Sequence, residues 1–313
     1  MDTFRGVHHG GIGVSDMERS LEFYREVLGF SELIADYSGD LPGMERVTGR
    51  PQTVARVAFL RNPRASRLGP GMIKLVQLLP PDGPGPIPEG ACWGEVGVAE
   101  VCIHVQGADA VLERLVNAHG CRQLMAIDVG PALPPREGEV AYAYIEEPDG
   151  GKIELIEFRP SPGFRAEPAI EGLTHVAFGV SDADRSSAFY RGLGFTDLVA
   201  DFQGVLDTMS HWFPDPKGQE QRLVLLDSPQ GAGIEAVQQI NQTKDCRGSW
   251  GHLGPMEFAI EVRDMDAACA GLRERGIELL CSPQTIIADG VRWSYVYFAE
   301  PDGIFVSLIQ PGF

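Results

Sequence analysis

The sequence predicts an α+β fold of four βαβββ units arranged in two tandem halves. Two repeats carry this prediction. An apolar stretch that ends in Ser-Asp occurs at 7–16 and again at 173–182, and the two copies lie 166 residues apart. The motif Trp-Gly-x-x-Gly-x-x-Glu occurs at 93–100 and again at 250–257. Self-similarity over this length indicates a duplicated chain.

The first unit is expected to start with a strand over residues 4–14. Ser15 or Asp16 then caps a helix, and Gly29 supplies the left-handed residue that ends it. The apolar residues of this helix recur at helical spacing, at Met17, Leu21, Tyr24 and Leu28. Three short strands complete the unit, around 31–37, 53–60 and 72–78.

The second unit is expected to contain a strand that ends near residue 105 and a helix over 108–119 closed by Gly120. Its last strand, over 152–156, follows the turn Glu-Pro-Asp-Gly at 147–150. The third unit repeats the first, and the fourth repeats the second.

This order predicts two domains and a linker. The first domain spans 1–160 and holds units 1 and 2, the linker spans 161–168, and the second domain spans 169–313 and holds units 3 and 4.

Composition narrows the class of protein. With 313 residues, 43% of them hydrophobic, the chain is long enough for about two domains with real cores. A formal net charge of -18 argues against nucleic acid or an anionic membrane as a partner. No apolar run reaches ~18 residues and no signal-peptide pattern is visible, so we expect a cytoplasmic protein. The six cysteines lack zinc-finger spacing and are expected to be reduced, structural thiols.

A strand with an inward His, then Val-Ser-Asp, then a helix with Phe-Tyr that closes at Gly-Phe resembles the vicinal oxygen chelate (VOC) superfamily. This superfamily includes glyoxalase I, methylmalonyl-CoA epimerase, extradiol dioxygenases, and bleomycin and fosfomycin resistance proteins. The resemblance covers nearly the whole chain. It implies two glyoxalase-like domains, each a curved mixed sheet around a cavity. It also implies one divalent ion (Zn, Mn, Fe, Co or Ni) whose ligands come from the first and last strands of two paired units.

Mapped through the repeated motifs, the resemblance implies four ligand positions in each half. The second half offers His175, Glu235, Glu257 and Ser307, and the first offers His9, Lys74, Glu100 and Glu154. Several of these glutamates stand between apolar residues of a strand, where a carboxylate is costly unless it is paired or binds metal. The competing interpretation is a glutamate on the solvated face of a half-exposed strand.

Lys74 makes the two halves unequal, because an ammonium group at a ligand position would repel a divalent ion. We therefore expect the working metal site at His175, Glu235 and Glu257. A second or alternative site, at His9, Glu100 and Glu154, is expected to be a degenerate copy.

A different pairing of units stays open. Some four-unit members of the superfamily pair the first unit with the fourth and the second with the third. That arrangement would gather Glu100, Glu154, His175 and Glu235 in one site. His175 and Glu235 are ligands in either arrangement.

Other residues are candidates for catalysis and substrate binding. Glu257 is expected to move a proton, with His211 and His252 as further catalytic candidates. The substrate contacts are expected at Trp212, Tyr295 and Tyr297. His211 and His252 could instead be incidental loop histidines, and Trp212 could be a packing anchor.

Three functions stay open at this point. The first is a glyoxalase-like lyase, isomerase or epimerase whose metal ion binds two adjacent oxygens of a small substrate. The second is an Fe(II) extradiol dioxygenase, although its usual ligand set of two His and one Glu is not matched at Glu257 and Ser307. The third is a metal-free protein that binds an aromatic or cationic small molecule, which Lys74 and the acidity would suit. In every case the partner is a small molecule, and a homodimer stays open.

Overall fold

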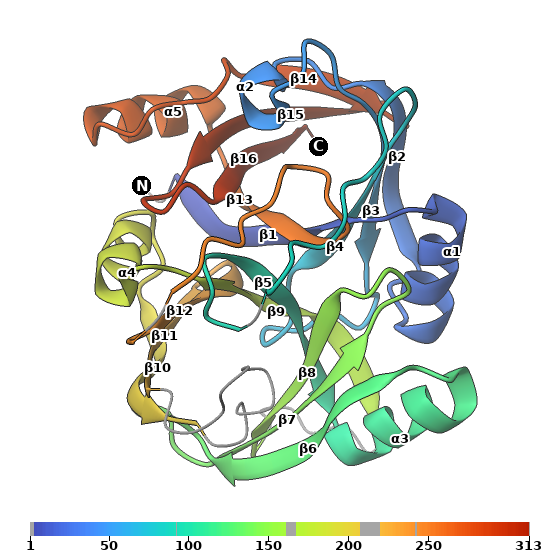
Figure 1. The fold of residues 1–313 in the computed structure, drawn as a ribbon, viewed down its shortest axis with the longest axis vertical. Helices are drawn as coiled ribbons and strands as arrows, with labels where there is room; N and C mark the ends of the chain where they lie inside the picture. The colour runs from blue at the N-terminus through green and yellow to red at the C-terminus, as the bar shows by residue number, and fades with distance from the viewer. Residues whose placement is uncertain (1–2, 92, 161–166, 207–219, 242, 313) are drawn as a thin grey trace.

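The computed structural model describes residues 3–91, 93–160, 167–206, 220–241 and 243–312 (Figure 1). Within these ranges the chain runs strand, helix, then three strands, four times over. None of the helices in the described ranges combines the length and the apolar character needed to cross a membrane.

The first half of the chain holds units 1 and 2. Unit 1 consists of β1 (Phe4–Gly13), α1 (Met17–Glu22) with a π-helical extension (Phe23–Val27), β2 (Glu32–Asp40), α2 (Glu45–Thr48), β3 (Val54–Arg61) and β4 (Met72–Leu78). Unit 2 consists of β5 (Gly97–Gln106), α3 (Ala108–His119), β6 (Gln123–Pro131), β7 (Glu139–Glu146) and β8 (Lys152–Arg159).

The second half holds units 3 and 4. Unit 3 consists of β9 (Ala169–Gly179), α4 (Ala183–Arg191), β10 (Asp197–Val205), β11 (Glu220–Ser228) and β12 (Gly231–Gln239). Unit 4 consists of β13 (Gly254–Val262), α5 (Met265–Glu274), β14 (Gln284–Ala288), β15 (Val291–Ala299) and β16 (Phe305–Gly312).

Two of the main helices start where the sequence predicts a cap. Asp16 accepts hydrogen bonds from the amides of Glu18 and Arg19, and Asp182 accepts one from that of Arg185. Asp264 caps α5 in the same way. These aspartates satisfy amide groups that a helix start leaves without a partner.

The strands form two curved sheets that are joined through inner strands of each. Sheet A has the order β2-β3-β4-β1-β13-β16-β15-β14, and sheet B the order β10-β11-β12-β9-β5-β8-β7-β6. The two sheets meet where β1 pairs with β12, at Val7 and Ala232. Figure 1 shows the ends of the chain in sheet A, in blue and red, and its middle in sheet B, in green and yellow.

Unit 1 therefore pairs with unit 4, and unit 2 with unit 3. The pairings are antiparallel, between β1 and β13 and between β5 and β9. This differs from the expected grouping, in which 1–160 and 169–313 would each enclose their own cavity. The pattern of apolar residues could not distinguish the two groupings, because both use the same strand edges. The boundaries 1–160, 161–168 and 169–313 stay a prediction about the sequence halves.

Each sheet curls until its outer strands approach one another. In sheet B, Asp201 of β10 donates its amide to the carbonyl of Pro134, in the loop between β6 and β7, at 2.6 Å. In sheet A, Tyr295 of β15 donates its hydroxyl to the carbonyl of Pro42 at 2.7 Å. Separate clusters of apolar side chains fill the two interiors. A third and larger cluster packs between the sheets and their helices.

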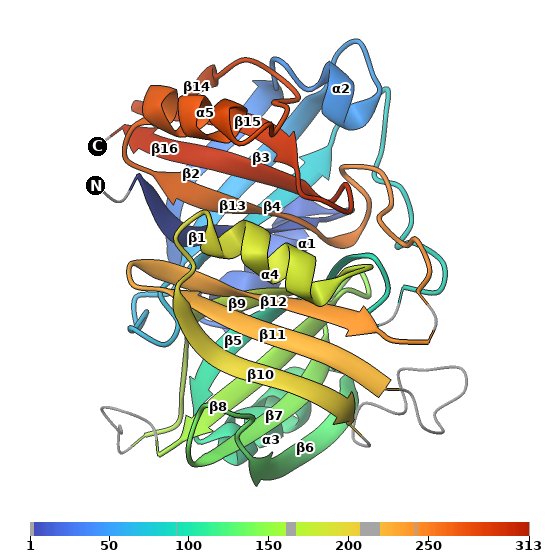
Figure 2. The ribbon, with the colours of Figure 1, turned by 90° about the vertical axis from the view of Figure 1, so that its left-hand side faces the viewer.

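Helix α4 lies over the junction of the two sheets (Figure 2). Tyr190 of this helix packs 5.5 Å from the ring of Phe178 in sheet B and 6.0 Å from that of Phe258 in sheet A, measured between ring centres. The helix therefore belongs to the core that joins the sheets.

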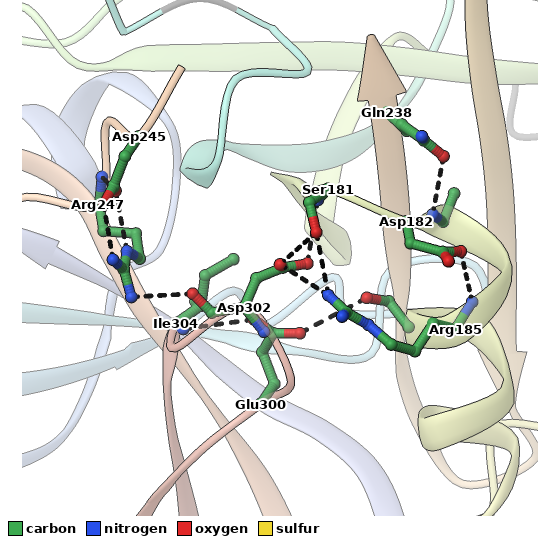
Figure 3. A network of polar contacts seen from close by, with 11 residues as sticks. Ser181, Asp182, Arg185, Gln238, Asp245, Arg247, Glu300, Asp302 and Ile304 are labelled. Carbon is green, nitrogen blue, oxygen red and sulfur yellow. Dashed lines mark hydrogen bonds and ion pairs between the residues drawn. The ribbon is translucent and has the colours of Figure 1, made fainter. Parts of the chain in front are cut away.

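A polar clamp also ties the sheets together (Figure 3). Asp302, in the turn after β15 of sheet A, accepts hydrogen bonds from the amide of Ser181 at 2.9 Å and from Arg185 at 2.7 Å. Both partners belong to unit 3, which lies in sheet B. Asp149 makes the equivalent contacts with Ser15 and Arg19. Each Glu-Pro-Asp-Gly turn thus connects one sheet to the other.

Replacing Asp302 with alanine is expected to lower the free energy of unfolding by about 2 kcal/mol, because Ser181 and Arg185 would lose a charged acceptor that is itself largely buried. The Asp302 side chain is only 10% exposed. Asp109→Ala is the matched control, since that carboxylate is 67% exposed in its pair with Arg159 and should contribute less than about 1 kcal/mol. Urea unfolding measures both variants. Equal losses would show that the clamp adds nothing beyond a surface ion pair.

Candidate functional site

Four candidate ligands converge inside sheet B. Glu100 comes from β5, Glu154 from β8, His175 from β9 and Glu235 from β12. All four are buried. The alternation of strand side chains places them on one face, and each pair of neighbouring strands contributes two of them. This is the alternative grouping that the sequence left open.

The four side chains are in close contact. The His175 Nε2 atom lies 3.0 Å from Oε2 of Glu235 and 3.6 Å from Oε2 of Glu154. The Tyr144 hydroxyl donates a hydrogen bond to Oε1 of Glu100 at 3.0 Å and lies 3.4 Å from Oε1 of Glu154. Tyr144 therefore holds the two carboxylates of unit 2 beside one another.

Several buried atoms of this cluster make no hydrogen bond of good geometry within the described residues. They are both ring nitrogens of His175, one oxygen of Glu100 and one oxygen of Glu154. The His175 Nε2 atom belongs to this set even though it lies close to Glu235, because the contact is poorly aligned. Each such atom costs about 1–3 kcal/mol when it is left without a partner.

A divalent cation fits this donor set. Carboxylate oxygens and an imidazole nitrogen suit Zn, Mn, Co, Ni or Fe. Donor atoms of Cys102, Glu154 and His175 all lie within 4.8 Å of one another. A cation held among these atoms would satisfy the groups that have no hydrogen-bond partner, so the residues present match the implied metal.

Burial and mutual repulsion shift the pKa values of the cluster. Burial raises the pKa of Glu154 to about 7, and it raises the pKa of Glu100 well above its ordinary value. Burial lowers the pKa of His175, but Glu235 and then Glu154 outweigh that effect, so the pKa is raised. Without a metal ion, protons on these groups therefore offset their crowded negative charge.

Binding of a divalent ion is consequently expected to weaken as the pH falls. Below about pH 7 Glu154 carries a proton that the ion must displace, so affinity should drop about tenfold per pH unit. Calorimetric titration with Mn²⁺ at pH 6 and pH 8, in buffers of different ionisation enthalpy, measures affinity and proton release together. Identical affinities with no proton release would contradict the proposed ligands.

A cavity of about 230 Å³ adjoins this cluster inside sheet B, and both Glu154 and Glu235 line it. Most of the wall is apolar, and its larger side chains are Trp93, Tyr142, Tyr144, Ile156, Phe158 and Leu225. Arg136 also lines the cavity, with its guanidinium 3.9 Å from the centre of the Phe158 ring. No carboxylate of the described residues forms an ion pair with Arg136. A small molecule in this cavity would therefore meet three carboxylates, those of Asp128, Glu154 and Glu235, and one cation.

Glu257, expected as a ligand beside His175 and Glu235, lies inside sheet A instead. Its carboxylate forms a buried ion pair with Lys74 and accepts a hydrogen bond from Trp250 Nε1 at 2.7 Å. The prediction of a His175, Glu235 and Glu257 site is therefore wrong, because β13 pairs with β1 and not with β9. Because Glu257 lies in sheet A and His175 in sheet B, the prediction that Glu257 moves a proton at the His175 site is also wrong.

His9 also lies in sheet A, so it does not form a site with Glu100 and Glu154. Its Nδ1 atom is 2.8 Å from Nδ1 of His8. Burial, followed by the influence of His8 and Lys74, keeps the pKa of His9 well below its ordinary value. The cavity beside these residues measures only about 30 Å³. The ammonium group of Lys74 lies in this cavity, at the place where a cation would bind.

The predicted substrate contacts Tyr295 and Tyr297 line this small cavity and not the larger one. His252 lines neither cavity, and its ring nitrogen Nδ1 lies 2.7 Å from the carbonyl of Leu253. This placement argues against His252 as a catalytic residue. His211 and Trp212 fall outside the described residues.

Sequence reasoning missed three residues of the sheet B site: Cys102, Arg136 and Tyr144. A signal existed for Tyr144, since the Tyr-x-Tyr pattern at 295–297 repeats one at 142–144. Arg136 lies in the loop between β6 and β7, and no repeated motif of the sequence includes it. Cys102 lies in an apolar strand, where a thiol usually indicates a small core residue.

Comparison with known proteins identifies the family. The model of the Glyoxalase/Bleomycin resistance protein/Dioxygenase superfamily matches residues 6–155 and again residues 172–308. The chain therefore belongs to this superfamily, which confirms the predicted resemblance and the α+β fold class.

Relatives with assigned names are enzymes. A 2-epi-5-epi-valiolone epimerase from an Actinomyces species is 30% identical over 171 residues, which cover 52% of this chain and 85% of that protein. A probable chloroplastic lactoylglutathione lyase from Arabidopsis thaliana is 32% identical over 178 residues, which cover 56% of this chain and 40% of that protein. The chain thus spans less than half of the lyase.

Solved structures agree in fold over almost the whole chain. Glyoxalase I from Zea mays has a TM-score of 0.62 at 19% identity, covering 98% of this chain and 92% of that one. A putative dioxygenase from Bacillus subtilis has a TM-score of 0.61 at 14% identity, covering 99% of this chain and 86% of that one. At such identities the likeness concerns the fold alone.

Proposed function

We propose that this chain is a metal-dependent lyase, isomerase or epimerase whose single active site lies in sheet B. Glu100, Glu154, His175 and Glu235 would hold the divalent ion. The observation that carries the proposal is a group of buried donor atoms that find no hydrogen-bond partner among the described residues and that adjoin a largely apolar cavity large enough for a small substrate. When bound, the ion would act as a Lewis acid on adjacent oxygens of the substrate.

The residues of the chain would supply the remaining chemistry. Glu154 lines the cavity, so its carboxylate lies beside a bound substrate and would take up and return the proton. Tyr144 would orient Glu154 through its hydroxyl. The aromatic and aliphatic wall would exclude water, which strengthens electrostatic interactions within the site.

Proton exchange with solvent tests this function. The chain, loaded with Mn²⁺, Zn²⁺ or Ni²⁺, is incubated in D₂O with 2-epi-5-epi-valiolone and with lactoylglutathione, which the names of the two relatives suggest. Deuterium incorporation beside the carbonyl, lost in Glu154→Gln, is the expected result. Oxygen uptake on catechols with Fe²⁺ would favour a dioxygenase, and purified protein that binds no metal would favour a metal-free binding protein.

Arg136 is expected to select ligands that carry a negative charge. Its guanidinium faces an apolar cavity, so a carboxylate there would gain a charge-assisted hydrogen bond. Arg136→Met should weaken binding of 4-phenylbutyrate roughly tenfold and leave 4-phenylbutanamide unchanged. Arg61→Met, which removes an exposed arginine of sheet A, is the control for a general loss of positive charge. Equal effects on acid and amide would rule out this role of Arg136.

A further inference from the structure

Cys102 occupies a central place in the sheet B cluster. In the antiparallel pair of β5 and β9 it lies opposite His175, and in the parallel pair of β5 and β8 it lies opposite Glu154. Its side chain is fully buried. The Cys102 Sγ atom, a Glu154 oxygen and a His175 nitrogen lie within 4.8 Å of one another. Three strands thus bring a thiol, a carboxylate and an imidazole to one point.

The repeated units show that the fold itself does not require a thiol at this position. The residue two places after the candidate ligand of the first strand is Gly11 in unit 1, Ala177 in unit 3 and Ala259 in unit 4. Each of these is small and offers no donor atom. Unit 2 alone carries a sulfur atom here, and unit 2 contributes to the sheet with unpartnered ligands.

The surroundings of Cys102 suit a ligand better than a core residue. Glu154 and His175 beside it have buried donor atoms without hydrogen-bond partners in the described part of the chain. Glu100 is already held by the Tyr144 hydroxyl, and the Cys102 thiol reaches it only at 3.9 Å. A thiol is a weak hydrogen-bond donor, so it satisfies these neighbours poorly.

We propose that Cys102 binds the divalent ion through its sulfur, beside Glu154 and His175, and makes the site prefer Zn²⁺ or Co²⁺ to Mn²⁺ or Mg²⁺. The inference rests on the proposed metal site and deepens it. When the sulfur–metal bond forms, the S–H bond breaks and its proton passes to solvent, with no change in oxidation state. Soft thiolate favours Zn²⁺ and Co²⁺, whereas an all-oxygen set suits Mn²⁺ and Mg²⁺.

Cobalt spectroscopy on the full chain tests the proposal. Metal-free protein titrated with Co²⁺ should show visible d–d bands together with a thiolate-to-cobalt charge-transfer band in the near ultraviolet. Cys102→Ser should lose the charge-transfer band and keep the d–d bands. Cys269→Ser removes another buried thiol, on α5, and should keep both. In competition experiments, Cys102→Ser should weaken Zn²⁺ binding roughly tenfold or more and leave Mn²⁺ binding unchanged.

The outcomes separate this inference from the proposed function. Visible bands without a charge-transfer band in the unmodified chain would overturn the role of Cys102 and leave the metal site standing. Absence of any cobalt spectrum would overturn both. Cys102→Ala provides a second variant if the serine variant does not fold, because alanine stands at the equivalent position in units 3 and 4.

Discussion

His175→Ala is expected to lower the affinity of the chain for a divalent ion at least ~100-fold, because removing even a group that only supports a ligand costs 10–100-fold. The imidazole Nε2 atom lies 3.6 Å from Glu154 and 3.0 Å from Glu235, so an ion held by either carboxylate would lie within reach of the imidazole. Mn²⁺ or Zn²⁺ is expected to raise the melting temperature of the unmodified chain, because it binds the folded state, and this rise should be absent in the variant. Calorimetry and thermal unfolding measure the two effects.

The duplication supplies a matched control for this experiment. His9→Ala removes the equivalent buried histidine of sheet A, where Lys74 and Glu257 already form an ion pair. It should destabilise the chain to a similar extent and leave metal affinity unchanged. Glu235→Gln should reproduce the loss seen in His175→Ala with little change in shape. Equal metal affinity in the His175→Ala and His9→Ala variants would contradict a metal site in sheet B.

The local structure of the chain could be predicted because its signals are short in range. Asp16 and Asp182 cap helices where the Ser-Asp pattern places them. The offset between the repeats then fixes which residues are equivalent. Each of these inferences depends on residues only a few positions apart, whose interactions do not depend on the rest of the fold.

The partner of each unit could not be predicted in this way. The first strands β1, β5, β9 and β13 are all apolar and present similar edges, so the sequence allows either grouping. The predicted site with Glu257 beside His175 is wrong for this reason, because Glu257 belongs to the unit that pairs with unit 1. His175 and Glu235 come from one unit, so they stay together whichever unit pairs with it.

The two sheets differ in how they neutralise the buried acids. In sheet B three glutamates surround one histidine, and protons or an added cation would offset their negative charge. In sheet A the Lys74 ammonium lies between Glu257 and the Tyr297 hydroxyl, 3.3 Å from the latter. A cation built into the chain therefore takes the place of a bound ion. Lys74 and Glu235 hold equivalent positions in their units. Lys74 lies opposite Gly11, two residues after His9, and Glu235 lies opposite Ala177, two residues after His175.

Lys74→Glu is accordingly expected to create a second metal site. The variant would place a carboxylate beside Glu257 and His9, and the His9 Nε2 atom is buried without a partner in the described residues. Without metal, two buried carboxylates lacking a cation should destabilise the chain by about 3–5 kcal/mol. Added Zn²⁺ or Mn²⁺ should restore the loss, and the metal content should rise from one ion per chain to two. Elemental analysis and unfolding with and without metal measure both effects.

Lys74→Met is the control, because it removes the ammonium group without adding a ligand. It should destabilise the chain in the same direction, since Glu257 would lose its partner, but it should bind no second ion and gain no stability from one. If the Lys74→Glu variant folds but still binds a single ion, then the Lys74 ammonium group is not what prevents metal binding in sheet A. The cavity of about 30 Å³ leaves room for an ion but not for a substrate, so the second site is expected to be inactive.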